Sequence, residues 1–363
     1  MASISKRGDY QWEAQVRRRG FPSQSKTFIS KAEAQTWAST IESEMARGVF
    51  VDRTEAERTT LKQLIDRYLK EVAIYHRGAN IESSQLRAVL KDPLSQRFVA
   101  TLNGSDFAKY RDSRLTGSAK QRQVKPGTIV KELQLLKRIL HIAKREWAIH
   151  LPENAVSNIK FPRVKDARSR RLGSTEERFL LAAFELNERG ADGVFSDGAR
   201  NPWMRPILML AIDTAMRRGE ILGLLWRHVD LSRQVAHLPI TKNGESRDVP
   251  LSTRAVAILE GLPRSLEERV FPVSEDSFKK CWQRGLQRAK EIYRLDCAKL
   301  GLVEDGNFLV NFRFHDCRHE ATTRLAELVQ NPMELARITG HKDLKMLLRY
   351  YNVTAEELAR KLG

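Results

Sequence analysis

Apolar and polar residues alternate in two short stretches near the start of the chain, residues 10–16 and 26–29. This period of two is typical of half-buried β-strands, so we expect a small sheet here. The turn between the stretches is strongly basic and contains Arg17, Arg18 and Arg19. Such a turn is either a DNA-contacting hairpin or an ordinary solvated turn, and the pattern favours neither.

A helix is expected directly after these strands. Ser30 and Glu33 have the spacing of a capping box, in which each side chain binds a free backbone N–H at the helix start. Gly48 provides the residue type that most often ends a helix. Residues 1–48 are therefore predicted to form one module of sheet and helix, followed by a polar linker over 49–59.

From residue 60 to about 158, apolar residues recur at steps of three and four, which predicts amphipathic helices. One apolar stripe consists of Leu61, Leu64, Ile65, Tyr68 and Leu69. The clearest helix covers 128–147, with a stripe of Ile129, Leu133, Leu136, Leu140, Ala143 and Trp147. Its other face is basic and carries Lys131, Lys137, Arg138, Lys144 and Arg145. We expect the stripe to face the core and the basic face to contact DNA, although a solvated face has the same pattern.

The rest of the chain is a basic segment followed by a large helical region. Residues 159–173 are irregular and basic, so we expect an interdomain linker that itself contacts phosphate. Residues 174–363 follow helical periodicity except for two strands, near 235–240 and 247–251, joined by Asn243-Gly244, a strong hairpin signal. The predicted fold is mainly α with small β elements, in several domains.

Charge narrows the range of partners. The 363 residues carry a net charge of +18, and such self-repulsion is usual in proteins that bind a polyanion. The excess is concentrated: residues 101–171 hold 17 Lys and Arg against 6 Asp and Glu, and residues 1–31 hold 7 against 2. This favours double-stranded DNA over a membrane surface, which would call for an amphipathic helix with aromatic anchors.

Apolar runs, the first residues and the cysteines indicate the cellular compartment of the protein. No apolar run approaches the roughly 20 residues of a membrane span, and the first residues lack the apolar core of a signal peptide. The cysteines, Cys281, Cys297 and Cys317, are too widely spaced for a disulfide framework or a zinc site. We expect an intracellular protein of a reducing compartment.

Four patterns in the last region suit the cleavage of a phosphodiester, which needs a nucleophile, neutralised phosphate oxygens and a proton for the leaving oxygen. In order they contain Arg217; Lys242; His315-Asp316-Cys317-Arg318-His319; and Gly340-His341 with Tyr350 nine residues later. Each residue alone also has an ordinary structural explanation, such as a surface ion pair between Arg217 and Glu220. Their joint occurrence favours chemistry.

Residue chemistry suggests the roles. Arg217 and Arg318 present planar, permanently charged groups that bind phosphate oxygens, and His315 and His341 would add hydrogen bonds. Lys242 fits the general acid, because a compact ammonium on a hairpin tip can reach the leaving oxygen. These charges make a metal ion or other cofactor unnecessary.

Taken together, the patterns resemble the tyrosine recombinase, or phage integrase, family, whose signature is Arg, Lys, His-x-x-Arg, His or Trp, then Tyr. The resemblance implies that Tyr350 is the nucleophile, because the family places it nine residues after that His; Tyr351 is a less favoured second phenol. Ala215 stands where the family often has glycine. Glu220, Asp316 and His319 are expected to support the site, and His319 to contact phosphate.

The resemblance also implies a layout and a reaction. Residues 1–48 would be an arm-type DNA-binding module, 60–158 a helical, SAM-like core-binding domain and 174–363 the catalytic domain. Attack would give a 3′-phosphotyrosine and a free 5′-hydroxyl, and a homotetramer would exchange strands between attachment sites of a prophage or mobile element. Residues 354–363 would dock on a neighbouring protomer. A DNA-bending host factor and an excisionase are the expected accessory partners, in the bacterial cytoplasm or nucleoid.

Two other functions fit many of the same residues. A type IB topoisomerase would share the chemistry but only relax supercoils. A catalytically idle DNA-binding regulator would keep the charge without forming a covalent adduct.

Overall fold

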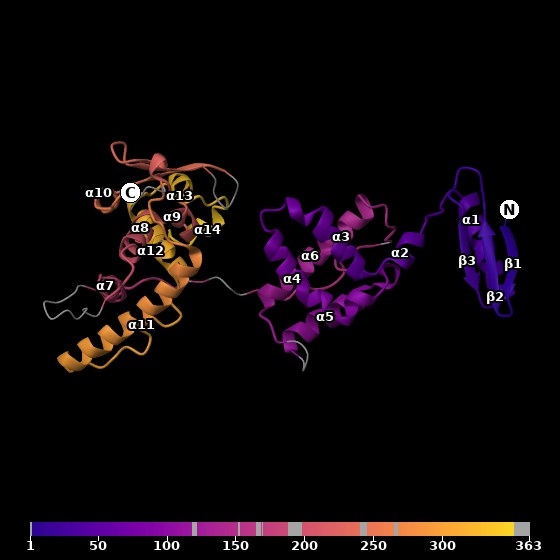
Figure 1. Cartoon of the computed structure of the whole chain (residues 1–363), viewed down its shortest axis with the longest axis horizontal. Coiled ribbons are helices and arrows are strands. Elements are labelled where there is room, and N and C mark those ends of the chain that lie inside the picture. Colours follow the sequence, from indigo (N-terminus) through magenta and orange to yellow (C-terminus); the bar gives the residue numbers. More distant parts are fainter. Residues whose placement is uncertain are drawn as a thin grey trace, which may run out of the picture. The chain divides into compact units, whose positions relative to one another are not determined.

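The computed structural model describes residues 2–117, 122–151, 153–164, 168, 170–187, 198–239, 245–264 and 268–351. The chain forms two compact units, residues 1–167 and 168–363, and Figure 1 labels their α-helices and the strands β1–β3. Helices dominate the described parts, and the named strands form two small antiparallel sheets. The predicted mainly α fold with small β elements is therefore confirmed.

The first unit begins with an antiparallel sheet in the order β1-β2-β3. Its elements are β1 (Ala2–Gly8), β2 (Gln11–Val16), β3 (Gln24–Phe28) and the helix that packs on it, α1 (Lys31–Ala46). Ser30 Oγ accepts a hydrogen bond from the Glu33 N–H at 3.2 Å, which is the Ser30 half of the predicted capping box. Gly48 follows the helix with a φ of 70°, a left-handed conformation that glycine adopts without steric cost.

The helical part of the first unit has one core. Its elements are α2 (Thr54–Arg58), α3 (Leu61–Glu71), η1 (Ala73–Tyr75), α4 (Ala79–Leu90), η2 (Pro93–Gln96), η3 (Val99–Thr101), α5 (Gly104–Thr116) and α6 (Pro126–Arg145). The predicted stripe of α6 is buried from Ile129 to Ala143. The helix ends at Arg145, however, so Trp147 lies beyond it, where the Arg67 guanidinium packs 4.4 Å from its ring centroid.

The second unit is built around α8, whose residues are buried against α10 and α12. Its helices are α7 (Ser174–Ala183), α8 (Met204–Thr214), α9 (Arg218–Leu222), η4 (Trp226–His228), α10 (Thr253–Glu260), α11 (Glu275–Leu300), α12 (Phe314–Leu328), α13 (Pro332–Thr339) and α14 (Lys345–Leu348). The core continues into stacked and edge-on aromatic rings of α11 and α12, including Phe278, Trp282 and Phe314. This packing fixes the end of α8 beside the start of α12.

The predicted hairpin is confirmed in its strands. β5 (Val235–Leu238) pairs antiparallel with β6 (Arg247–Pro250), and β4 (Val229–Asp230) adds a third strand. Leu238 lies opposite Arg247, so Arg247 stands at the base of the turn. The turn residues Asn243-Gly244 lie outside the described residues.

Arginines at the start of the second unit bind carboxylates of that unit. Arg168 donates to Asp316 Oδ2 at 2.6 Å, Arg171 donates to Glu320 at 3.0 Å, and Arg170 pairs with Glu176. Phosphate contact by this linker stays a prediction, but each of these three side chains already has a carboxylate partner. The reason is that α12 and α7 place acidic side chains next to them, which no local sequence pattern indicates.

Candidate active site

Arg217 lies at a sharp change of chain direction between α8 and α9. Ala215 is left-handed, with φ 53° and ψ 21°, and Arg217 is the residue before the first turn of α9. The Arg217 backbone N–H and its Nη1 both donate to Glu220, each at 2.8 Å, and Nη2 donates to the Gly340 carbonyl at 3.1 Å. The strained turn thus aims the guanidinium at the end of α13.

Glu220 is a buried bridge between two arginines. Its side chain is 7% exposed and accepts two hydrogen bonds of 2.9 Å from Arg247, besides those from Arg217. Burial alone would raise the pKa of Glu220, but the hydrogen bonds from Arg247 and Arg217 outweigh it and hold the pKa below its ordinary value. The pair of Arg217 and Glu220 therefore exists, but as part of a buried cluster and not as a surface ion pair.

Arg318 is the most deeply buried cation of the cluster, with 4% of its surface exposed. It lies on α12 and donates to the Ala215 carbonyl and, at 2.5 Å, to the Thr339 carbonyl. Burial, followed by the positive charges of Arg217 and Arg247, lowers the pKa of the guanidinium to about 9. A bound anion would stabilise these charges, because an opposite charge within a few ångströms favours the ionised form.

His341 stands next to this cluster, directly after Gly340, which ends α13 with a φ of 69°. Its Nδ1 lies 2.7 Å from Thr339 Oγ1, and Thr339 Oγ1 donates its own proton to the Leu335 carbonyl. Nδ1 is therefore the protonated nitrogen, and Nε2 is left for a ligand. Burial, with the charges of Arg318 and Arg217, lowers the pKa of His341 to about 3.

Tyr350 follows α14, and its phenol oxygen contacts side chains of α12 and of the residue before it. The oxygen lies 2.5 Å from Nδ1 of His319 and accepts a hydrogen bond of 2.9 Å from Arg349. His315 is exposed in the first turn of α12, and its ring centroid lies 5.2 Å from that of His319. Electrostatic interactions link Tyr350 and Arg217 to Arg318.

The structure thus brings together five of the six predicted catalytic residues, namely Arg217, His315, Arg318, His341 and Tyr350. The sixth, Lys242, lies outside the described residues, and in sequence it falls between β5 and β6. Arg247 and Arg349 were not predicted. The position of Arg349 next to the tyrosine was the only available signal for it, whereas Arg247 had none.

Comparison with known proteins decides the family. The model of the phage integrase family matches residues 192–357. The shufflon-specific DNA recombinase of Escherichia coli is 37% identical, over 84% of this chain and 72% of its own length. A putative integrase/recombinase of Haemophilus influenzae (strain ATCC 51907 / DSM 11121 / KW20 / Rd) is 33% identical over 97% of this chain and 87% of its own length. The chain belongs to the phage integrase family.

Solved integrase structures share the fold of this recombinase. The Tn1549 transposon integrase in complex with transposon right end DNA matches with a TM-score of 0.61 and 15% identity, over 84% of this chain and 98% of that one. A lambda integrase dimer bound to a COC′ core site matches with a TM-score of 0.60 and 18% identity, over 96% of this chain and 94% of that one. The recombinase is therefore a DNA strand-transferring enzyme by family, and it has the fold of these integrases. Among its described residues, no helix combines the length and apolar character needed to cross a membrane.

The two adjacent tyrosines of the recombinase have different surroundings. Both side chains pack against the small apolar cluster around Leu347, but the Tyr351 hydroxyl donates to the Val329 carbonyl at 2.6 Å. Burial raises the pKa of Tyr351. Of the two phenols, only that of Tyr350 makes hydrogen bonds to the histidine and arginine of the cluster.

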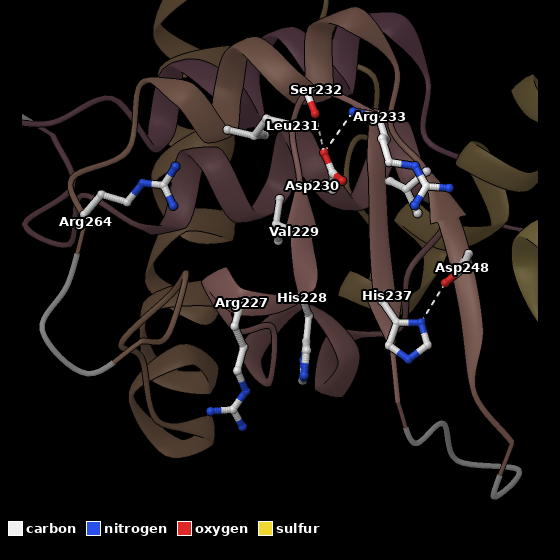
Figure 2. Close-up of a pocket in the computed structure, with 11 residues that line it drawn as sticks. Arg227, His228, Val229, Asp230, Leu231, Ser232, Arg233, His237, Asp248 and Arg264 are labelled. Carbon is white, nitrogen blue, oxygen red and sulfur yellow. Dashed lines mark hydrogen bonds and ion pairs between the residues drawn. The ribbon is translucent and has the colours of Figure 1, made fainter.

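A pocket of about 720 Å³ on the outer face of the β4–β6 sheet lies apart from these residues (Figure 2). It is lined by basic and imidazole side chains, including Arg227, His228, Arg233, His237 and Arg264. Much of this charge is already bound, since Arg227 pairs with Glu268 and His237 contacts Asp248 at 2.7 Å. None of the described residues that line this pocket is a predicted catalytic residue.

The predicted DNA-contacting residues lie on the surface of the first unit. Arg17, Arg18 and Arg19 are exposed after β2, and Lys131, Lys137, Lys144 and Arg145 are exposed on α6. Arg138 is also exposed on α6, and it donates to Glu82 at 3.1 Å, while Glu82 also accepts from Tyr68 at 2.9 Å. Arg138 therefore has a structural role, and DNA contact by the whole set stays a prediction.

Proposed function

We propose that this recombinase cuts and rejoins duplex DNA through a 3′-phosphotyrosine on Tyr350, and so recombines the attachment sites of a prophage or other mobile element. The observation that carries the proposal is the buried cationic cluster next to one phenol. Among the described residues, both hydrogen-bond partners of the Arg318 guanidinium are neutral carbonyl oxygens. A scissile phosphate would supply the missing negative charge.

The reaction divides between the residues as follows. The Tyr350 oxygen attacks phosphorus, Arg217 and Arg318 neutralise the non-bridging oxygens, and His315 and His341 add hydrogen bonds. The bond from phosphorus to the 5′ oxygen breaks, and Lys242 protonates that oxygen. The new phosphotyrosine bond conserves the phosphodiester energy, so no high-energy cofactor is needed. The two arginines and the lysine supply the charge stabilisation that a metal ion would otherwise give.

The names of relatives support mobile DNA as the substrate. One relative is the shufflon-specific DNA recombinase, and another is the integrase of Salmonella phage P22, which is 25% identical over 62% of this chain and 54% of its own length. Topoisomerase-like relaxation and idle regulation are not favoured, since the relatives are named recombinases and integrases. We propose the bacterial cytoplasm or nucleoid as the site of action.

Assembly is proposed from the same likeness. Solved structures with this fold include a lambda integrase tetramer bound to a Holliday junction, with a TM-score of 0.59. A homotetramer of this chain would exchange strands on DNA, with residues 1–48 on arm sites and residues 60–158 on core sites. Residues 354–363, which would dock on a neighbour, lie outside the described residues. A DNA-bending host factor and an excisionase are the proposed accessory partners.

The deciding experiment traps the adduct. The protein is incubated with a nicked duplex that carries the attachment site flanking its gene, so that the cleaved strand diffuses away and religation fails. We expect a covalent protein–DNA adduct whose DNA-bearing peptide contains Tyr350, and no adduct with Tyr350→Phe. An adduct mapped to Tyr351, or none with the wild-type protein, would overturn the proposal.

A further inference from the structure

The hydrogen bonds around the Tyr350 phenol determine which atom faces its proton. Arg349 Nη2 lies 2.8 Å from His319 Nδ1 and 2.9 Å from the phenol oxygen. A guanidinium can only donate, so Nδ1 of His319 accepts and carries no proton. The proton between Nδ1 and the phenol oxygen, which are 2.5 Å apart, therefore belongs to Tyr350.

We propose that His319 is the general base of the cleavage step. As the Tyr350 oxygen forms its bond to phosphorus, its proton moves to Nδ1 of His319, and the bond from phosphorus to the 5′ oxygen breaks. In the rejoining step the 5′-hydroxyl attacks phosphorus and gives its proton back to Lys242, the bond from phosphorus to the Tyr350 oxygen breaks, and His319 returns the proton to the departing phenol. The inference rests on the proposed function and deepens it. The histidine is thus a catalytic residue that acts on the nucleophile, where the sequence suggested a phosphate contact.

The rest of the site keeps this imidazole neutral before DNA arrives. Burial, followed by the positive charge of Arg349 and the neighbouring His315, lowers the pKa of His319 to about 4. Other charged or titratable groups that face it are Asp316 and Arg318 on its own helix, Tyr350 after α14 and His341 after α13. A neutral imidazole can accept a proton, and the negative charge of a bound phosphate would then strengthen it as a base.

The geometry also explains how the base is held in place. His319 lies on α12 one residue after Arg318, so the helix that binds the phosphate also carries the base. The Thr323 hydroxyl donates to the His319 carbonyl at 3.0 Å within this helix. Arg349 donates to both reacting partners, which stabilises negative charge on the phenol oxygen as the proton leaves.

The test measures single-turnover adduct formation on the same nicked duplex between pH 6 and 10. His319→Asn keeps a polar atom close to the position of Nδ1 but cannot act as a base. We expect a loss of about 100-fold near pH 7.5, the lower end of the range for general acid–base catalysis, and a rate that recovers as hydroxide rises. In His319→Ala, added imidazole should restore part of the rate.

His237→Asn is the matched control, because His237 is exposed, contacts Asp248 and lies outside the catalytic cluster. It should behave as wild type. Wild-type rates in both His319 variants would overturn the inference, as would equal losses at every pH without imidazole rescue, which indicate a structural role. The wild-type reaction separates the two proposals: if it yields an adduct on Tyr350, only the role of His319 is at stake.

Discussion

The hydroxyl of Tyr351 donates a hydrogen bond of 2.6 Å to the backbone carbonyl of Val329, at the end of α12. This contact holds the second phenol in a structural position one residue after the proposed nucleophile, Tyr350. We expect Tyr351→Phe to keep adduct formation and to lower the free energy of unfolding by about 1 kcal/mol, the usual contribution of one hydrogen bond. Chemical denaturation and adduct assays on one preparation measure both. A Tyr351→Phe protein without adduct would show that this phenol takes part in the chemistry.

The buried pair of Glu220 and Arg247 should matter for stability. Glu220→Gln leaves both Arg217 and Arg247 without their carboxylate, and breaking a buried pair costs about 3 kcal/mol or more. Because the pKa of Glu220 lies below its ordinary value of 4.5 in the folded protein, its stabilisation is present above that value and is lost as pH falls through the folded pKa. Denaturation from pH 7 to pH 3 should show the two proteins converging. A constant difference across this range would contradict the interpretation.

Ala215 is strained, since a non-glycine residue in the left-handed region costs about 1–2 kcal/mol. Ala215→Gly relieves this strain and loses one buried methyl, worth about 0.8 kcal/mol, so we expect stability within about 1 kcal/mol of wild type and full adduct formation. Ala215→Val should instead be strongly destabilising, because branched side chains hardly tolerate positive φ. Thermal unfolding of both variants provides the comparison, and a stable Val variant would refute the argument.

His341 should take up a proton when DNA binds. Its Nδ1–H is bound to Thr339, so Nε2 can donate to a phosphate only when the ring is protonated. The low pKa in the free protein, about 3, rises when an anion binds, so DNA affinity should fall as pH rises. Calorimetry in two buffers of different ionisation enthalpy measures the uptake. In His341→Gln we expect fewer protons to be taken up on DNA binding. An unchanged proton uptake would exclude His341 as the residue that is protonated.

Two basic residues of α6 should respond differently to substitution. Lys131 is exposed, so Lys131→Ala should weaken binding to all DNA sequences about equally. It should also reduce the slope of log affinity against log salt concentration by about one. Arg138 is bound to Glu82, so Arg138→Ala should mainly reduce stability. Binding titrations at several salt concentrations, with denaturation curves, separate the two effects. If Lys131→Ala leaves the salt slope unchanged, this face of α6 does not contact phosphate.

The sequence by itself determined the features that follow local rules. The cap at Ser30, the buried stripe of α6 and the strands of the hairpin depend on neighbouring residues, so periodicity and residue type were sufficient to predict them. The order of Arg217, the His-x-x-Arg pattern and Tyr350 was also enough to indicate the family.

Only the tertiary structure decided how these side chains meet. Arg247 binds Glu220 from 27 residues away, Arg168 binds Asp316 from 148 residues away, and His319 meets the phenol across 31 residues. Such contacts depend on how α8, α12 and the sheet pack together. The local sequence pattern carries no information about that packing. It shows which face of a helix is buried, but the partners of the polar side chains depend on which other elements pack next to that helix.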